Sequence, residues 1–153
     1  MDIETAPNFR AADNNFRWDA VAHQPYKQDA NVPFRDISRQ VLFHEDALAC
    51  ELRYFEMEAD GYSTLERHEH AHAVMILRGS GDCLVGDEVR AVKQFDLVSI
   101  PGWQWHQFRA TRGEPLGFLC MVNVQRDRPQ LPTADDLAQL KRIPGVAAFL
   151  AEE

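Results

Sequence analysis

The 153-residue sequence predicts an all-β domain, an antiparallel sandwich or barrel, with an irregular N-terminal arm and a short helical tail. Two observations predict the β class. Runs of strand-forming residues follow one another from about Ser38 to Val124, at a spacing of about ten residues. Turn signals separate these runs and no helical period intervenes, which is typical of antiparallel sandwiches and barrels.

The N-terminal arm is expected over residues 1–36, which are polar and irregular. Its prolines are too closely spaced for a long helix: Pro7, Pro25 and Pro33. We expect this arm to lie over the barrel or over a partner subunit.

The barrel is expected over residues 37–126. Its predicted strands are Arg39–Phe43, Ala49–Glu58, Thr64–His68, His72–Leu77, Gly81–Val85, Glu88–Val92, Leu97–Ile100, His106–Ala110 and Pro115–Val124. The turn signals between them are Asp60-Gly61, Gly79-Ser80-Gly81, Gly86-Asp87, Pro101-Gly102 and Arg112-Gly113.

The C-terminal tail, residues 127–153, changes to a helical pattern. Thr133 precedes an acidic first turn and the apolar positions Leu137 and Leu140, which indicates a helix N-cap. Pro144-Gly145 ends that helix, and one further turn is expected after it.

Composition and charge exclude several classes of function. The formal net charge is -8, which argues against binding nucleic acid or an anionic membrane surface. The residues up to Gln28 lack the apolar core of a secretory signal, and no run of about 18 apolar residues occurs. The three cysteines (Cys50, Cys83 and Cys120) have no CxxC spacing and are expected to be free thiols. We therefore predict a cytoplasmic protein.

Three of the six histidines are concentrated within five residues: His68, His70 and His72. Residues two apart in a strand point to the same face, so a His-x-His pair aims two imidazoles at one point. A further histidine from a neighbouring strand would complete a site for a divalent transition metal. The alternative is a solvated surface loop that is rich in histidine.

Two motifs resemble those of the cupin superfamily, over roughly residues 40–124. The first contains Gly61, the histidine cluster and Gly79; the second is Asp96-x4-Pro101-x4-His106. The second motif departs from the family pattern, because Phe95 stands where it normally begins with Gly and Ala110 where it ends with Asn. The resemblance implies a single jelly-roll barrel, or double-stranded β-helix, that binds a metal and pairs as a homodimer.

The resemblance also implies a ligand set. Counting back from Gly79 without a gap places His72 where the family has Glu, and places Glu66 and His68 at its leading histidines. The predicted ligands are Glu66, His68, His72 and His106. The alternative pairs His68 with His70, but then only Ala71 would separate His70 from His72, too little for a hairpin. His70 is therefore expected at the turn, contacting substrate or substituting as a ligand.

Cys120 lies in an apolar strand, where a cysteine is most often a small buried hydrophobe. The alternative is a nucleophile that points at the metal pocket, where metal and imidazole charge would lower its pKa. Cys50 and Cys83 are interpreted as structural. His23 and His44 are interpreted as ordinary polar residues, although His44 could face the pocket.

Other side chains remain candidates for lining the pocket or binding an anion. Trp103, Trp105 and Phe108 could be a pocket wall, barrel core or a dimer contact. The candidate anion-binding residues are Arg53, Arg109, Arg126 and Arg128, and the candidate phenol donors are Tyr54 and Tyr62.

More locally, the segments 61–72 and 117–120 resemble a bacterial cupin group that includes a methylthiotransferase acting on S-methyl-1-thio-xylulose 5-phosphate. This resemblance implies a metal-dependent enzyme in methylthioadenosine salvage that produces 1-deoxyxylulose 5-phosphate. Manganese is the expected metal, with iron, nickel or zinc as alternatives, and a thiol such as glutathione is the expected co-substrate. Cys120 would be the nucleophile, the alternative being direct attack by the external thiol with Cys120 as a bystander. The proton donor would be His70 or a tyrosine. The alternatives are a sugar-phosphate isomerase, a dioxygenase, or a non-catalytic cupin that binds a small molecule.

Overall fold

The computed structural model describes residues 7–26 and 35–151 of the chain. It contains nine strands and two helices in these residues. They are β1 (Gln24–Pro25), β2 (Arg35–Glu45), β3 (Cys50–Tyr62), β4 (His72–Arg78), β5 (Ser80–Val85), β6 (Glu88–Lys93), β7 (Leu97–Ile100), β8 (His106–Arg109), β9 (Leu116–Asn123), α1 (Ala134–Leu140) and α2 (Pro144–Leu150).

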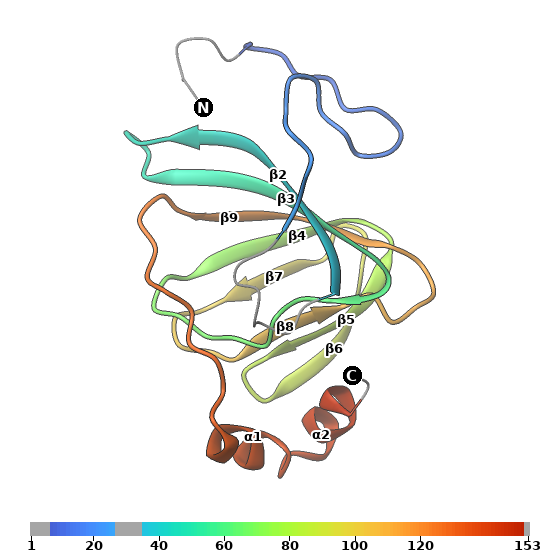
Figure 1. The fold of residues 1–153 in the computed structure, drawn as a ribbon, viewed down its shortest axis with the longest axis vertical. Coiled ribbons are helices and arrows are strands. Elements are labelled where there is room, and N and C mark those ends of the chain that lie inside the picture. The colour runs from blue at the N-terminus through green and yellow to red at the C-terminus, as the bar shows by residue number, and fades with distance from the viewer. Residues whose placement is uncertain (1–6, 27–34, 152–153) are drawn as a thin grey trace.

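The strands form one curled antiparallel sheet, ordered β6-β5-β8-β3-β9-β4-β7, with β2 also paired to β3 and β1 to β2 (Figure 1). The long strand β3 makes this curl possible. Residues 50–57 of β3 pair with both β2 and β9, whereas Tyr62 at its far end pairs with Arg109 of β8. The sheet therefore bends round an interior, and the predicted all-β fold is confirmed.

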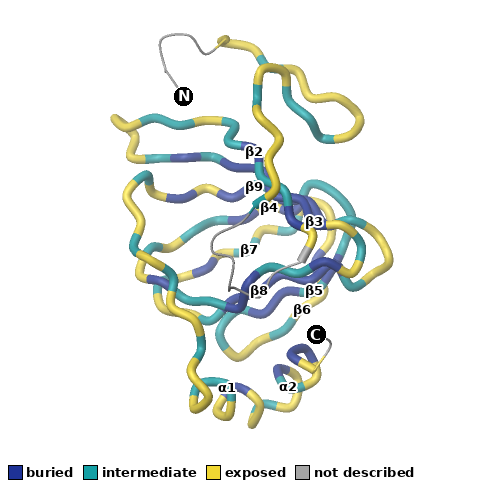
Figure 2. Tube along the Cα trace, in the orientation of Figure 1, coloured by how far each residue is buried: buried dark blue, intermediate teal, exposed yellow. Residues whose placement is uncertain are grey.

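Apolar side chains fill the interior in two clusters. The larger lies inside the curled sheet and includes Phe55, Val74, Phe108 and Phe118. The smaller seals the end of the barrel with residues of both helices, among them Leu140 and Phe149. Figure 2 shows that the buried residues concentrate in the central strands, while the N-terminal segment and the tail are largely exposed.

Most predicted strands are present, with one exception. Residues 64–68 do not form a strand. They are extended, but make only isolated bridges, from Glu66 to His106 and from Arg67 to Gln130. Each bridge joins one residue of this segment to one residue elsewhere, so the segment does not extend the hydrogen-bonded ladder of any strand.

The arm that was predicted as irregular is described only in part, because residues 1–6 and 27–34 lie outside the described residues. Its described part includes the two-residue strand β1, which the sequence did not predict. Phe16 and Trp18 of this arm pack on Tyr54 of β3. The side-chain amide of Gln40 holds the same segment by donating to the Phe16 carbonyl at 2.7 Å. The arm thus covers part of the outer face of the sheet.

The tail contains both predicted helical segments. Thr133 caps α1 by accepting from the Asp136 backbone N–H, and Asp136 reciprocates by accepting from the Thr133 N–H. Pro144 occupies the first turn of α2. No helix among the described residues is long and apolar enough to cross a membrane.

Phe95 has a φ of 72°, in the left-handed region that a bulky residue rarely adopts. Its backbone N–H donates to the Ile76 carbonyl at 2.7 Å, so the turn before β7 fixes this conformation. Glycine adopts such a φ without strain. This explains physically why a cupin-like motif would begin with glycine here.

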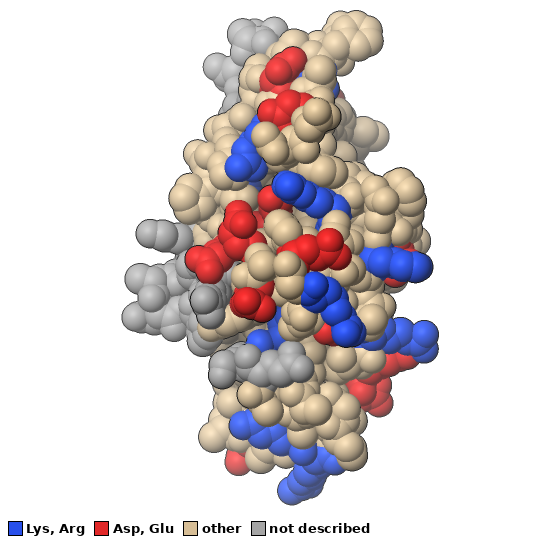
Figure 3. Space-filling view, turned by 90° about the vertical axis from the view of Figure 1, so that its right-hand side faces the viewer, with Lys and Arg blue, Asp and Glu red and all other residues tan. Residues whose placement is uncertain are grey.

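Acidic and basic side chains are interspersed over the face of the molecule in Figure 3. This face therefore presents no continuous basic area among the described residues, in keeping with the net charge of -8.

Candidate active site

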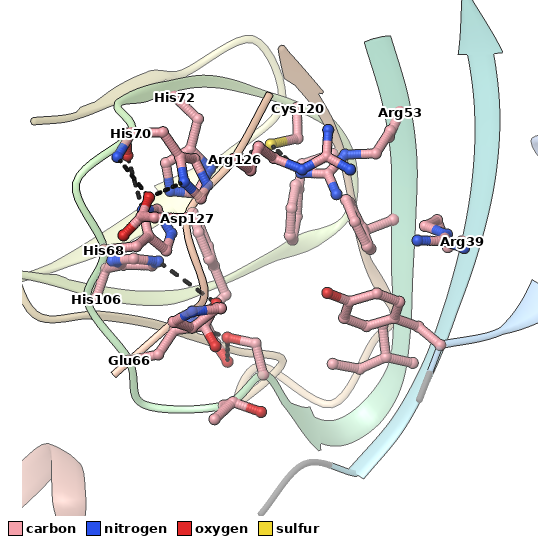
Figure 4. A pocket seen from close by; sticks show the side chains of 18 residues that line it. Arg39, Arg53, Glu66, His68, His70, His72, His106, Cys120, Arg126 and Asp127 are labelled. Carbon is pink, nitrogen blue, oxygen red and sulfur yellow. Dashed lines mark hydrogen bonds and ion pairs between the residues drawn. The ribbon is translucent and has the colours of Figure 1, made fainter. Parts of the chain in front are cut away.

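A cavity of about 290 Å³ opens inside the curled sheet (Figure 4). Strands β2, β3, β4, β8 and β9 and the two loops around residues 63–70 and 126–129 contribute to its walls. Its lining residues are Tyr26, Ile37, Arg39, Arg53, Phe55, Ser63, Thr64, Glu66, His68, His70, His72, His106, Phe108, Phe118, Cys120, Arg126, Asp127 and Pro129. Most of the chemically reactive candidates from the sequence thus share one space.

His68 in the loop before β4, His72 at the start of β4 and the distant His106 of β8 meet at one end of this cavity. Single ligand atoms of His68, His72 and His106 lie within 4.8 Å of one another. A backbone hydrogen bond holds the segment around His68 against the loop that precedes His106, because the Trp103 N–H donates to the His68 carbonyl at 2.7 Å. A Cβ at Gly102 would lie 2.4 Å from the Glu69 carbonyl oxygen, so glycine is needed for this approach.

Backbone carbonyls fix the orientation of two of these rings. His68 Nδ1 donates to the His70 carbonyl at 2.7 Å, and His106 Nδ1 donates to the Gln104 carbonyl at 3.0 Å. Each ring therefore keeps its Nε2 lone pair for another partner. His72 Nε2 is buried and has no hydrogen-bond partner. Such an orphaned nitrogen, beside two oriented ones, fits a metal ion.

The electrostatics of the cluster also suit a metal. Burial, followed by the neighbouring imidazoles, lowers the pKa of His72 to about 2. Burial likewise lowers the pKa of His106 to about 4 and is the main cause that lowers the pKa of His68. All three rings are therefore neutral near pH 7, the form in which imidazole binds a divalent ion. The cluster is compatible with a divalent metal.

Glu66 lies at the edge of the same cluster. Its backbone pairs with that of His106, and its Oε1 is 4.0 Å from His106 Nε2. The four residues that the sequence indicated as ligands therefore line one end of the cavity together.

His70 stacks in parallel on His68, with 3.6 Å between ring centroids, and Asp127 accepts from its Nδ1 at 2.7 Å. Asp127 also accepts from the backbone N–H groups of Glu69 and His70. Burial acts to raise the pKa of Asp127, but these hydrogen bonds outweigh it and lower that pKa. His68, His70 and Asp127 form a second group close enough to hold an ion. The sequence did not indicate Asp127, whose partner lies 57 residues away in the chain.

Cys120 points into the cavity between a histidine and an arginine. Its Sγ lies 3.2 Å from His72 Nδ1 and 3.5 Å from Arg53 Nη2, which donates to it. Burial raises the pKa of the Cys120 thiol, while Arg53 opposes this rise. The loss of hydration is therefore the dominant influence of the protein itself on this thiol, and the lowering by metal and imidazole charge that the sequence indicated stays a prediction.

The other candidates divide between the cavity and the rest of the barrel. Arg53, Arg126 and Phe108 line the cavity. Arg109 lies outside it, against the rings of Tyr62 and Phe149. Tyr54 faces the arm, and Trp105 packs with the cluster beneath the helices. Residues that are not part of the cavity lining also include His23, Trp103 and Arg128.

His44 is not part of the cavity lining and pairs with Glu51 and Asp46, each at 3.0 Å. Cys50 is half-buried and Cys83 is buried, and both are free thiols that do not line the cavity. Burial raises the pKa of Cys83 to about 12.

Comparison with known proteins identifies the family. The cupin domain family matches residues 53–122. A protein of Rhodospirillum rubrum is 57% identical over 142 residues, which cover 93% of this chain and 91% of that protein. This chain belongs to the cupin superfamily. The predicted family and barrel are therefore confirmed.

Solved structures of other cupins agree. A cupin 2 conserved barrel domain protein from Rhodopseudomonas palustris is 62% identical, with a TM-score of 0.87, over 92% of this chain and 97% of that one. A cupin-2 domain from Rhodospirillum rubrum is 56% identical, with a TM-score of 0.85, over 94% of this chain and 97% of that one.

The 57% identical relative is named 1-methylthio-D-xylulose 5-phosphate methylsulfurylase. A relative this similar over nearly the whole length is an enzyme, which confirms the prediction that this cupin is an enzyme.

Proposed function

We propose that this cupin transfers the methylthio group of 1-methylthio-xylulose 5-phosphate to a thiol and releases 1-deoxyxylulose 5-phosphate, as a step of methylthioadenosine salvage in the cytoplasm. The observation that carries the proposal is a thiol beside a metal-type cluster: Cys120 Sγ lies 3.2 Å from His72 Nδ1. The name of the 57% identical relative supports the same substrate.

The residues proposed to hold a divalent metal are His68, His72 and His106, with Glu66 as a fourth ligand. The metal would supply Lewis-acid polarisation of the C2 carbonyl of the substrate. We propose manganese, since mixed imidazole and carboxylate donors suit it. The carbonyl of the substrate would then point towards the histidine end of the cavity, with C1 beside Cys120.

Cys120 is the proposed nucleophile. Its thiolate attacks the methylthio sulfur, a sulfur–sulfur bond forms, and the bond between that sulfur and C1 breaks. The electron pair of the broken bond passes to C1 and is delocalised as an enolate. Arg53 donates to the sulfur at 3.5 Å, so its charge favours the thiolate against the effect of burial.

His70 is the proposed proton donor to C1. Its Nδ1 is bonded to Asp127, so its Nε2 is the nitrogen that exchanges a proton with the substrate. The protonated product is 1-deoxyxylulose 5-phosphate. A second thiolate, proposed to be glutathione, then attacks the methyl disulfide on Cys120, takes the methylthio group and restores the thiolate.

We also propose that this cupin is a homodimer. Large apolar side chains on the outer face of the sheet are exposed, among them Phe43, Met75, Leu97 and Met121. The strand register places Met121 opposite Leu52 and Ala73, so the apolar area is continuous across β3, β9 and β4. A second copy covering this face would account for it, and light scattering would measure the mass.

The reaction is tested by incubating the manganese-loaded protein with 1-methylthio-xylulose 5-phosphate and glutathione, and following the C1 methyl signal of the product by NMR. We expect product from the wild type and a loss of turnover of roughly 100-fold or more in Cys120→Ser, because the nucleophile is removed. The matched control is Cys50→Ser, which exchanges a cysteine outside the cavity.

Two results would contradict the proposal. Turnover by Cys120→Ser at the rate of the wild type would show that the external thiol attacks the substrate directly. Absence of turnover in a wild type that holds one metal ion per chain would reject the reaction.

A further inference from the structure

The cavity has two ends of different chemistry (Figure 4). The histidines, Glu66 and Asp127 gather at one end. Arginines contributed by β2, by β3 and by the loop after β9 line the other: Arg39, Arg53 and Arg126. The chain has a net charge of -8, so the three arginines give this end of the cavity a charge opposite to that of the molecule as a whole.

Arg53 is the most buried of the three, at 8% exposure. Its guanidinium lies 4.8 Å from the centroid of the Phe55 ring, and its Nη2 donates to Cys120. Its Nε is buried and has no hydrogen-bond acceptor. A buried donor without an acceptor is unfavourable, and an anionic oxygen in the cavity would relieve it.

Arg126 is held beside Arg53 by a shared carboxylate. Glu51 Oε1 lies 3.9 Å from Arg53 Nε and 3.6 Å from Arg126 Nη1, and both separations exceed a hydrogen bond. The short contact of Glu51 is instead with His44, at 3.0 Å from Oε2. Arg126 Nη1 donates instead to the Asn123 carbonyl at 3.1 Å. Glu51 therefore draws the two guanidiniums together by charge without accepting a hydrogen bond from either, and Arg53 Nε is left for a ligand.

We propose that Arg53, Arg126 and Arg39 form a subsite that binds the phosphate of the substrate, which rests on the proposed function. Three guanidinium charges against the one carboxylate of Glu51 leave an excess that matches a phosphate dianion. Guanidinium N–H groups also fit phosphate oxygens in pairs. Phosphate bound here orients the sugar along the cavity, with its carbonyl end at the histidines.

The carboxylates of glutathione are the other anions that reach this cavity, because the thiol has to approach Cys120. They are singly charged, whereas the subsite gathers three cations, so the structure favours phosphate. The experiments below separate the two.

The first experiment measures binding without turnover. Inorganic phosphate is titrated calorimetrically into the manganese-loaded wild type, Arg126→Gln, Arg39→Gln and the control Arg90→Gln. Arg90 is an exposed arginine of β6 outside the cavity. We expect binding to weaken about 10-fold or more in Arg126→Gln and Arg39→Gln, as for loss of a charge-assisted hydrogen bond, and to be unchanged in Arg90→Gln. Equal affinity in all four proteins would overturn the subsite.

The second experiment identifies the anion by kinetics. We expect Arg126→Gln to lower kcat/KM for 1-methylthio-xylulose 5-phosphate by about 10-fold or more. The kcat/KM for phosphate-free 1-methylthio-xylulose should stay at the value of the wild type. The KM for glutathione should not change. A rise in that KM, without one for the uncharged thiol 2-mercaptoethanol, would overturn the proposal and assign the arginines to the thiol.

The two proposals can fail separately. If the wild type turns over neither sugar but binds phosphate through Arg126, the proposed reaction is rejected and the anion subsite stands. If the wild type turns over both sugars equally well, the reaction stands and the phosphate subsite is rejected.

Discussion

The two faces of β3 and β9 carry different chemistry although the residues alternate along the same strands. On the inner face, Arg53 pairs in register with Cys120, and both line the cavity. On the outer face, the next residue, Tyr54, donates to Glu56 at 2.7 Å and is covered by Phe16 of the arm. Side chains in a strand point alternately to opposite faces, so adjacent residues serve different environments.

This difference indicates a division of labour. The inner face leaves buried polar atoms without hydrogen-bond partners, such as the Nε2 of His72 and the Nε of Arg53. On the outer face, Arg78 donates to both carboxylate oxygens of Glu56, at 2.9 and 3.1 Å. We therefore expect substitutions on the inner face to change activity, and those on the outer face to change the free energy of unfolding.

The largest effect is expected from His106→Ala on the inner face. Changes to groups that merely orient a metal ligand typically cost about 10- to 100-fold in affinity or activity, so removing His106, a proposed ligand itself, should cost more than about 100-fold in kcat/KM. The metal content, measured by inductively coupled plasma mass spectrometry, should fall together with kcat/KM. The control is His23→Ala in the exposed arm, which should retain both. Full metal content and activity in folded His106→Ala would contradict the division of labour between the inner and outer faces.

Asp127→Asn should have a smaller effect at the same end of the cavity. Asparagine keeps one acceptor oxygen, so it can still accept from His70 but not also from the Glu69 N–H, and it loses the negative charge beside His70 Nδ1. We expect kcat to fall by about 10- to 100-fold with metal content unchanged, because His70, the proposed proton donor, is less well oriented. The control is Asp87→Asn, in an exposed turn.

Loss of metal in Asp127→Asn would point instead to the second candidate group, in which His68, His70 and Asp127 hold the ion. An unaltered kcat would remove His70 and Asp127 from the mechanism.

The sequence predicted the strands well where alternation and turn residues agree. The hairpin of β5 and β6 is an example, since Gly86 at its turn has a φ of 66° that glycine readily adopts. Residues 64–68 were wrongly predicted as a strand. A local sequence pattern can favour an extended backbone, but it cannot show whether a neighbouring strand pairs with it, and these residues make only isolated bridges. The strand β1 depends on its contact with β2, which no local pattern contains.

The candidate site shows the same limit. The histidines could be predicted because they repeat within a few residues and fit a family motif. Asp127 and Glu51 could not, because each acts on a partner that only the topology brings near: Asp127 lies on the loop after β9, and Glu51 meets Arg126 across the end of the sheet. The effect of burial on the pKa of the Cys120 thiol could not be predicted either, because burial depends on the fold around the thiol.

The smallest effect on activity is expected from Gly117→Ala, on the outer face directly before the inner-facing Phe118. A Cβ at Gly117 would lie 1.9 Å from the Tyr54 hydroxyl oxygen. Tyr54 cannot move aside easily, because its ring is packed against Phe16 and Trp18 and its hydroxyl is bonded to Glu56. Overpacking of this kind costs about 1–3 kcal/mol, so we expect the free energy of unfolding to fall by that amount.

Chemical denaturation of Gly117→Ala would measure this loss, and kcat/KM of the folded protein should match that of the wild type. Gly145→Ala is the matched control, because a Cβ there has no atom within 4 Å and the residue lies in the first turn of α2. Gly145→Ala should unfold at the same denaturant concentration as the wild type or slightly above it. If Gly117→Ala instead lost kcat at full stability, the strain would be reaching Phe118 and Cys120 through the strand. The two faces would then be mechanically coupled, and the division of labour between them would fail at β9.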